Sequence, residues 1–148
     1  MKKAIAIVVI SLSTTIFSYG YAADNPSNGH SDYGVEAPVD GLRLNNGEQW
    51  NMDDHTRTIS KKMKKTFLDA DHSTQENLNA LGVKLRKQVN ELIVGCTMSG
   101  KSHDQLHIFL NSQIPTINAL ALADNYNSAR ALEIQLKDQF EAYQKYFK

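Results

Sequence analysis

The stretch CTMSGKSHDQLH holds the chain's only cysteine, a methionine and two histidines. Thiolate, thioether and imidazole groups are the ligands that select Cu(I) or, less specifically, zinc. His103 and His107 are four residues apart, so both can reach one ion if they lie on a helix. We therefore predict a copper-related metal site, with zinc as the alternative metal. Its candidate ligands are Cys96, Met98, His103, His107 and Met52.

The same residues also have ordinary structural interpretations, which stay open at this point. A lone cysteine on an apolar helix face is usually a small hydrophobe. His103 can bond to backbone groups or water at a helix start, and His107 can be a half-exposed helix residue. Met52, Met98 and Trp50 can pack in the core without binding anything.

Residues 1–23 have the features of a secretory signal peptide. Two lysines precede an apolar run from Ala4 to Phe17, and small residues follow it. This run is shorter than the ~20 apolar residues that a membrane-spanning helix requires. We expect export to a bacterial periplasm, with an extracellular destination as the alternative, and no stable membrane insertion after cleavage.

Charge and composition narrow the classes of function. The chain has 16 Lys and Arg residues against 16 Asp and Glu residues, without the concentrated positive charge that phosphate backbones require, so we expect no nucleic-acid partner. About 125 residues would remain after cleavage, which suits a single domain. One cysteine cannot form an internal disulfide, so Cys96 is a buried thiol, an intermolecular partner or a metal ligand.

The exported chain divides into a leader and a helical domain. Residues 24–40 combine Pro, Gly, Ser, Asn and Asp with almost no large aliphatic residue, which predicts a flexible leader. Residues 41–148 form the predicted domain. It opens with GLRLNNGEQWNM, in which Asn-Asn-Gly favours a turn and Trp50 provides an apolar anchor before the first helix.

Apolar residues recur every three to four positions in four segments, which predicts four helices. The first helix is expected over residues 53–68. The second should begin at Ser73, where STQE has the pattern of a capping box, and end at Gly95.

The third helix is expected to begin at Ser102, with Gln105 as the reciprocal capping partner, and Pro115 predicts a kink near residues 111–112. ADNYN separates it from the fourth. Short links favour antiparallel neighbours, so we predict an all-α fold, an up-down-up-down antiparallel four-helix bundle. Its core should centre on Leu85, Leu92, Leu110, Ile117, Leu132 and Leu136.

This topology would bring the end of the second helix and the start of the third to one end of the bundle. Cys96 closes the apolar face of the second helix and His103 opens that of the third, with a six-residue link between them. His107 lies one turn deeper. His55 is expected at the same end, on the outer face.

The C-terminal stretch LHIFLNSQIPTINALALADNYNSARALEIQLKDQFEAYQKYFK resembles the soluble periplasmic b-type cytochromes. That family binds haem between an axial methionine at the start of the first helix and an axial histidine that follows an Ala-Tyr pair near the chain's end. Met52 matches the methionine, but Ala142-Tyr143 is followed by Gln144. The resemblance therefore implies the four-helix fold, and a haem carrier only with altered ligation, so haem is not the expected cofactor.

A second resemblance spans LRLNNGEQW, CTMSGKSHDQLH and YQKYF. These segments are similar to a group of small exported bacterial proteins, most of them hypothetical and some associated with heavy-metal handling. The resemblance implies that Trp50, Cys96, His103 and His107 recur together.

No nucleophile elbow, glycine-rich loop or carboxylate dyad supports catalysis, so we do not expect an enzyme. We predict a periplasmic metal-binding bundle that acts as a copper buffer, carrier or sensor. The alternatives are a haem-binding electron carrier with altered ligation, and a cofactor-free bundle that binds a protein partner or misfolded chains.

Overall fold

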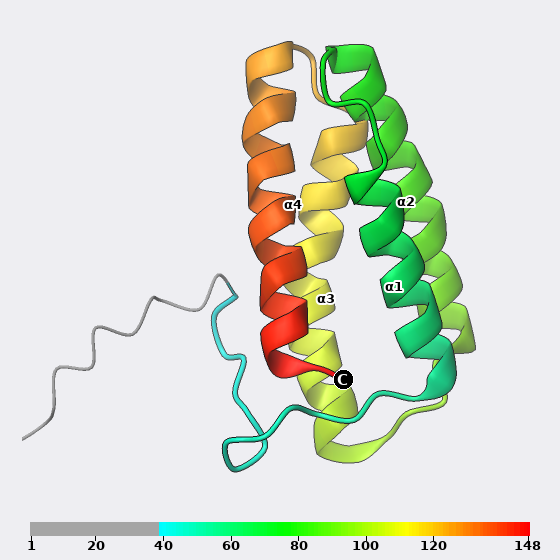
Figure 1. Ribbon diagram of the computed structural model, residues 1–148, viewed down its shortest axis with the longest axis vertical. Helices are drawn as coiled ribbons and strands as arrows, with labels where there is room; N and C mark the ends of the chain where they lie inside the picture. Colours follow the sequence, from blue (N-terminus) through cyan, green and yellow to red (C-terminus); the bar gives the residue numbers. More distant parts are fainter. Residues whose placement is uncertain (1–38) are drawn as a thin grey trace, which may run out of the picture. The chain divides into compact units, whose positions relative to one another are not determined.

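The computed structural model describes residues 39–148. The predicted signal peptide and all but the last two residues of the predicted leader lie outside the described residues. The helices are α1 (Asp54–Leu68), α2 (Gln75–Gly95), α3 (Gly100–Ala121) and α4 (Tyr126–Tyr146) (Figure 1). The described part of the chain contains no strand. The predicted all-α fold with four helices is therefore confirmed.

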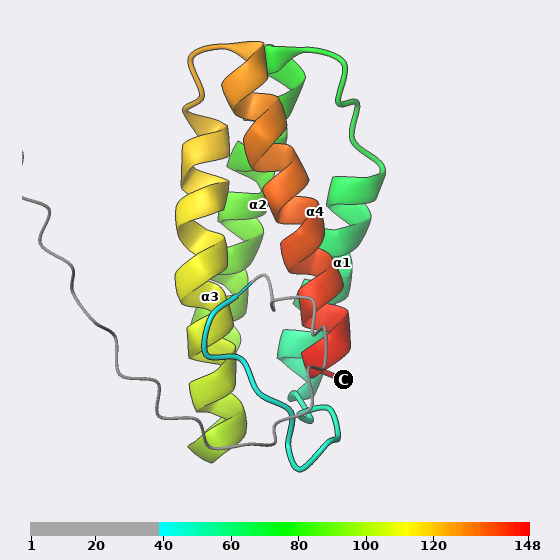
Figure 2. The same ribbon diagram turned by 90° about the vertical axis from the view of Figure 1, so that its left-hand side faces the viewer.

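Helices that follow one another in the sequence pack side by side. α1 packs on α2, α2 on α3 and α3 on α4, and α2 also touches α4. Figures 1 and 2 show the links 69–74 and 122–125 at one end, called the upper end below, and the link 96–99 at the other, the lower end. None of the helices in the described residues is long and apolar enough to cross a membrane.

The start of α2 differs by one residue from the prediction. Thr74, not Ser73, is the N-cap, because its side chain accepts a hydrogen bond from Asn77 N at 3.2 Å. Ser73 N donates instead to the side chain of Asp71 at 2.9 Å, within the preceding loop. Ser73 fits the capping-box pattern because Glu76 follows three residues later, yet the loop takes Ser73 and the neighbouring hydroxyl residue Thr74 caps the helix.

The start of α3 differs more, since the helix begins at Gly100 rather than at Ser102. Gly100 has a φ of 69°, a conformation that glycine adopts without strain, and it lets the chain turn at once into the helix. Gln105 does not take part in a cap, because its side chain accepts a hydrogen bond from Arg43 N at 2.8 Å. The link between α2 and α3 is therefore shorter than the predicted six residues. α3 continues through Pro115.

The core follows the predicted apolar spacing. Five of the six expected central residues are buried: Leu85, Leu92, Leu110, Ile117 and Leu136. Leu132 is only half-buried, and the neighbouring Glu133 is the buried side chain of that turn. The core also includes Val39 and Leu42, which precede α1.

The segment before α1 pairs with the last residues of the chain. Trp50 N donates to Tyr146 O at 2.8 Å, and Lys148 N donates to Trp50 O at 2.9 Å. Met52 N then donates to Lys148 O at 2.8 Å. These hydrogen bonds fix the entry of α1 beside the end of α4, at the lower end of the bundle.

Candidate ligand cavity and histidine pair

Two of the predicted metal ligands lie in direct contact. The Nε2 atoms of His103 and His107 are 3.0 Å apart, and the ring centroids are 4.3 Å apart with the rings nearly perpendicular. The i, i+4 spacing on α3 explains this contact, as predicted. His103 is half-buried and His107 is exposed, so the pair is open to solvent.

The other three predicted ligands lie in apolar surroundings. Met52 is only 3% exposed and belongs to the core. Cys96 is the C-cap of α2 and, like Met98, is half-buried against the core. Within residues 39–148, no group of three or more His, Cys, Asp or Glu side chains could hold a metal ion. The structure thus brings together the two histidines, and the five-residue metal site stays a prediction.

His55 faces α2 rather than the outside. Its Nε2 lies 3.0 Å from Glu91 O, near the end of α2. A Cβ atom on Gly95 would overlap the imidazole ring, so glycine is needed there for the ring to pack. His55 therefore helps to hold α1 on α2, which is a structural role.

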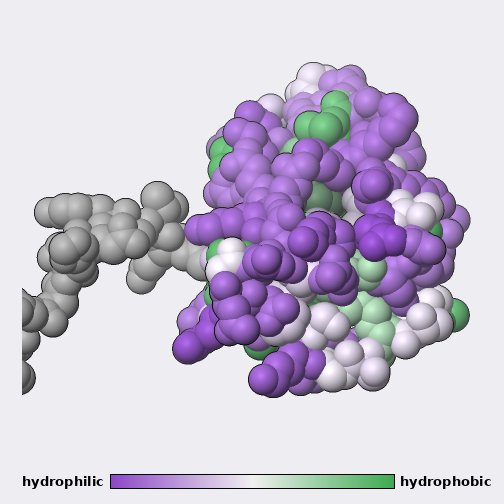
Figure 3. All heavy atoms as spheres, turned by 60° about the horizontal axis from the view of Figure 1, so that its bottom comes forward, coloured by the Kyte–Doolittle hydropathy of each residue, from purple (hydrophilic) through white to green (hydrophobic). Residues whose placement is uncertain are grey.

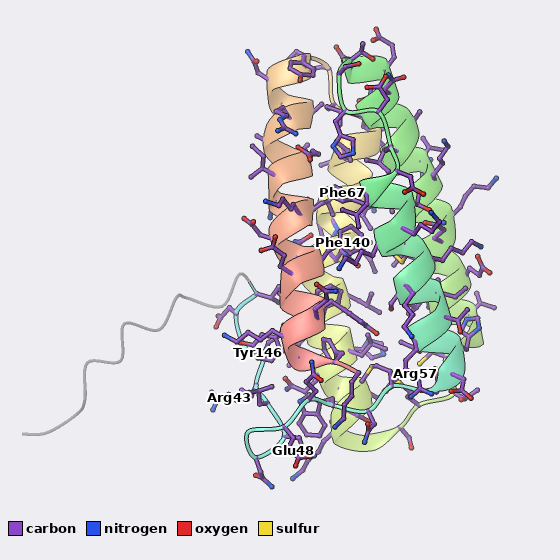
Figure 4. All side chains as sticks on the ribbon, viewed as in Figure 1. Arg43, Glu48, Arg57, Phe67, Phe140 and Tyr146 are labelled. Atoms are coloured by element: carbon purple, nitrogen blue, oxygen red, sulfur yellow. The ribbon has the colours of Figure 1, made fainter. Side chains whose placement is uncertain are left out.

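A cavity of about 360 Å³ opens between α1, α3 and α4 in the lower half of the molecule. Its size falls in the range of roughly 300–1,000 Å³ that is typical of small-molecule sites. Above it, the Phe67 and Phe140 rings join α1 to α4, with centroids 5.2 Å apart (Figure 4). The apolar lining residues are Met63, Leu92, Leu106, Phe109, Leu110, Phe140 and Phe147.

Two polar side chains of the cavity wall have unused hydrogen-bonding capacity. Gln113 is 2% exposed, and its amide nitrogen has no hydrogen-bond partner in the described part of the chain. The Tyr143 hydroxyl is also buried, and the nearby Ser60 hydroxyl does not meet it in ordinary hydrogen-bond geometry. Burial raises the pKa of Tyr143, and the nearby Ser60 and Arg57 offset this only in part. Buried polar atoms without partners cost free energy, so both would gain from a ligand that hydrogen-bonds to them.

All charged residues that line the cavity are basic. They are Arg57, Lys61, Lys64 and Lys148, and the described lining contains no aspartate or glutamate. The segment KKMKK of α1 divides its lysines between two faces. Lys62 pairs with Glu91 at 3.0 Å and Lys65 with Asp69 at 2.6 Å, away from the cavity.

The hydrogen bonds of α1 explain why space remains beside α4. Asp53, the N-cap of α1, accepts hydrogen bonds from Thr97 N and Oγ1, each at 2.9 Å, in the α2–α3 link. Thr66 accepts a further bond from Gln88 of α2 at 2.8 Å. Within the described residues, no ion pair joins α1 to α4 directly, and the Ser60 and Tyr143 hydroxyls approach each other without ordinary hydrogen-bond geometry. α1 is thus fixed to α2, and its other side faces the cavity.

The pKa of Asp53 is well below its usual value. Desolvation of the carboxyl group raises the pKa, but the hydrogen bonds from Thr56 and Thr97 together outweigh it. Such hydrogen bonds favour the charged form. Asp53 is therefore ionised over the whole range in which the protein would work.

Sequence reasoning assigned nothing to His72, which forms a polar cluster at the upper end. Its Nδ1 lies 2.9 Å from the buried Glu133 carboxylate and its Nε2 lies 2.9 Å from Phe67 O. Glu133 also pairs with Arg130. Through these two contacts His72 bridges the end of α1 to α4. No local spacing links His72 to Glu133, so the sequence carried no signal for this cluster.

The surface of the lower end is mostly hydrophilic, with small hydrophobic areas (Figure 3). The large exposed apolar side chains are spread over the helices and their ends: Leu68, Val83, Ile93, Val94, Leu122, Tyr126 and Ile134. No family model, curated protein or solved structure matches the chain. The cavity and the histidine pair are therefore the features that point to a function.

Proposed function

We propose that the protein is a non-enzymatic binding protein, an up-down-up-down antiparallel bundle that carries a small organic molecule in the cavity between α1, α3 and α4. One observation supports this above all. The cavity has apolar walls and contains two buried polar groups without partners, on Gln113 and Tyr143. Most natural small-molecule sites combine a mainly apolar lining with a few such polar groups.

The chemistry of the lining favours binding over catalysis. Among the residues described, the lining offers amides, hydroxyls and cations but no imidazole, thiol or carboxylate. Imidazole, thiol and carboxylate side chains are common general bases and nucleophiles of enzymes. With the predicted signal peptide, the proposal describes a periplasmic carrier.

The test fills the cavity and measures the binding of a polarity-sensitive apolar dye. Leu110→Trp replaces a lining leucine by a larger aromatic side chain that fills the cavity, so it should abolish the fluorescence increase of the dye. Leu122→Trp, at a side chain that is 75% exposed, is the matched control and should bind the dye normally. Equal dye binding by both variants, with native helical content, would refute a site in this cavity.

A second candidate function, copper binding, is supported by the histidine pair. Two imidazole nitrogens 3.0 Å apart are close enough to chelate one ion after a small side-chain adjustment. Cys96, with Met98 or Met52, would have to complete a Cu(I) site. Metal binding requires neutral imidazoles and a thiolate, so affinity should fall below about pH 6.5.

Competition against a Cu(I) chelator tests this second function. His103→Ala and Cys96→Ser should each weaken binding by more than about tenfold. His55→Ala is the control, because His55 belongs to α1 and its ring contacts Glu91 O of α2. If the unaltered protein and all three variants compete equally, the copper function is wrong.

A further inference from the structure

The basic lining of the cavity identifies the class of ligand. We infer that the ligand is an acidic amphiphile, a carboxylate with an apolar body, whose acid group is held by Lys61 and Lys64. This inference rests on the proposed ligand-binding function and adds the chemistry of the ligand. The apolar body would lie against Phe109, Leu110 and Phe140, which line the cavity.

The pairing of the α1 lysines is the main evidence. Four lysines occur within five residues, and two of them are matched by acidic partners, namely Lys62 with Glu91 and Lys65 with Asp69. Lys61 and Lys64 both line the cavity, and neither has an acidic partner within the described residues. Being three apart, they project from the same face of the helix. The two unmatched charges therefore stand together at the cavity.

The other two cations of the lining are less available. Arg57 already pairs with Asp54, and its Nη1 donates to Met52 O at 2.9 Å. Lys148 follows the end of α4 and is held through its backbone by Trp50 and Met52. Both add positive potential around the cavity, which attracts an anion even without direct contact. A cationic ligand would meet four like charges, and no Asp or Glu side chain of residues 39–148 lines the cavity.

The wall limits the shape of the ligand as well as its charge. An anion with no apolar body would leave the aromatic and aliphatic walls unused, and a purely apolar molecule would leave Lys61 and Lys64 unmatched. Gln113 and Tyr143 add partners for an oxygen within the ligand body. Because its pKa is raised by burial, Tyr143 remains a neutral hydroxyl that can donate to such an oxygen.

Three probes with the same alkyl chain separate charge from apolar contact: dodecanoate, dodecanol and dodecyltrimethylammonium. Each displaces the dye from the full chain at pH 8, below its micelle concentration. Dodecanoate should bind about tenfold more tightly than dodecanol, the scale of two partly exposed charge pairs, and the cation should bind most weakly. The preference for dodecanoate should shrink as salt is added.

The neighbouring lysines provide a matched control. The double variant Lys61→Gln with Lys64→Gln should bind dodecanoate and dodecanol equally, with its affinity for dodecanol unchanged. The double variant Lys62→Gln with Lys65→Gln removes the same charge from the same helix. It should keep the full preference for dodecanoate, because these lysines lie outside the cavity lining.

The outcomes distinguish the two levels of the proposal. Equal binding of dodecanoate and dodecanol by the unaltered protein would overturn the acidic-amphiphile inference and leave the proposed function standing. So would an equal loss of preference in both lysine double variants, because it would indicate a general charge effect. If none of the three probes displaces the dye and Leu110→Trp does not alter dye binding, the proposed function itself fails.

Discussion

The contacts of α2 with α3 and of α1 with α4 are built in opposite ways. At Gly82 the α2 backbone approaches α3 so closely that an added Cβ would overlap the backbone of Ala121. α1 and α4 instead meet through the rings of Phe67 and Phe140, and the cavity opens below them. Figure 4 shows these two rings between the helices, with Arg57 nearer to the lower end.

This difference separates stability from binding within one small bundle. A close backbone contact is fully packed and leaves no room for a ligand. α1 is held on α2 by Asp53, His55, Lys62 and Thr66, so its contact with α4 can stay open without loss of the fold. The α1–α4 side is therefore where a ligand can enter at the smallest structural cost.

The strongest test of the close contact is Gly82→Val. The branched side chain would overlap the Ala121 backbone, which cannot move without displacing α3. We expect a loss of about 4 kcal/mol or more in the free energy of unfolding, measured by urea denaturation. Ala80→Val, on the exposed face of the same helix, should cost less than about 1 kcal/mol. A mild effect at Gly82 would mean that the two helices are not in close contact.

Alanine substitutions at two leucines compare the stability of the packed core with that of the cavity wall. Leu85 is 0% exposed and does not line the cavity, whereas Leu110 lines it. Leu85→Ala should cost roughly 2 to 5 kcal/mol because it creates a new cavity, and Leu110→Ala should lie at the low end of that range. Leu110→Ala should also alter dye binding, while Leu85→Ala should not. If both variants lost the same free energy of unfolding and bound the dye equally, there would be no cavity between α1 and α4.

The sequence predicts the packed core of the bundle better than the cavity between α1 and α4. Apolar residues spaced by three and four identify helices and inward-facing leucines, so the number of helices and most of the core are predictable. The spacing does not say whether inward-facing residues of two helices touch. Gln113 and Phe140 follow Leu110 and Leu136 at the three-to-four-residue spacing of the inward faces, yet only the three-dimensional arrangement reveals the cavity that they line.

The candidate metal site is predictable only where its spacing is local. His103 and His107 meet because four residues separate them on one helix. The relation of Cys96 to His103 depends on where α3 begins, and the true start at Gly100 shortens the link. Likewise, the contact of His72 with Glu133 joins residues 61 positions apart, and no short motif encodes it.

The residue at position 144 should decide whether the cavity can bind haem. Gln144 lines the cavity, and the predicted resemblance to b-type cytochromes aligns it with their axial histidine. The unaltered protein should give at most a weak five-coordinate spectrum with haem. Gln144→His should raise haem affinity by about tenfold, measured by the Soret band, because it supplies an iron ligand. Lys145→His is the control, since Lys145 is exposed and outside the lining. Tight six-coordinate binding by the unaltered protein would restore the cytochrome-like interpretation.

The smallest expected effect concerns Asp53, one of the residues that tie α1 to the α2 side. Its pKa is lowered in the folded state relative to about 3.9 in the unfolded chain, so its ionised form stabilises the fold. This contribution is fully present above about pH 4 and is lost as the pH falls below that value. Asp53→Ala should lower the free energy of unfolding by about 1 kcal/mol at pH 7, as expected for a lost N-cap.

Urea denaturation at pH 7 and near pH 3 measures this effect. The difference in stability between the unaltered protein and Asp53→Ala should shrink near pH 3, because Asp53 binds a proton in the unfolded chain but stays ionised in the fold, where Thr56 and Thr97 donate to it. Thr97→Val keeps the N-cap bond of Thr56 and loses only the hydroxyl donor, so it should reproduce a smaller part of the change. If Asp53→Ala instead loses the same free energy at both pH values, the carboxylate charge does not hold α1 to the α2–α3 link. Another interaction would then have to explain why α1 packs on α2 and leaves a cavity beside α4.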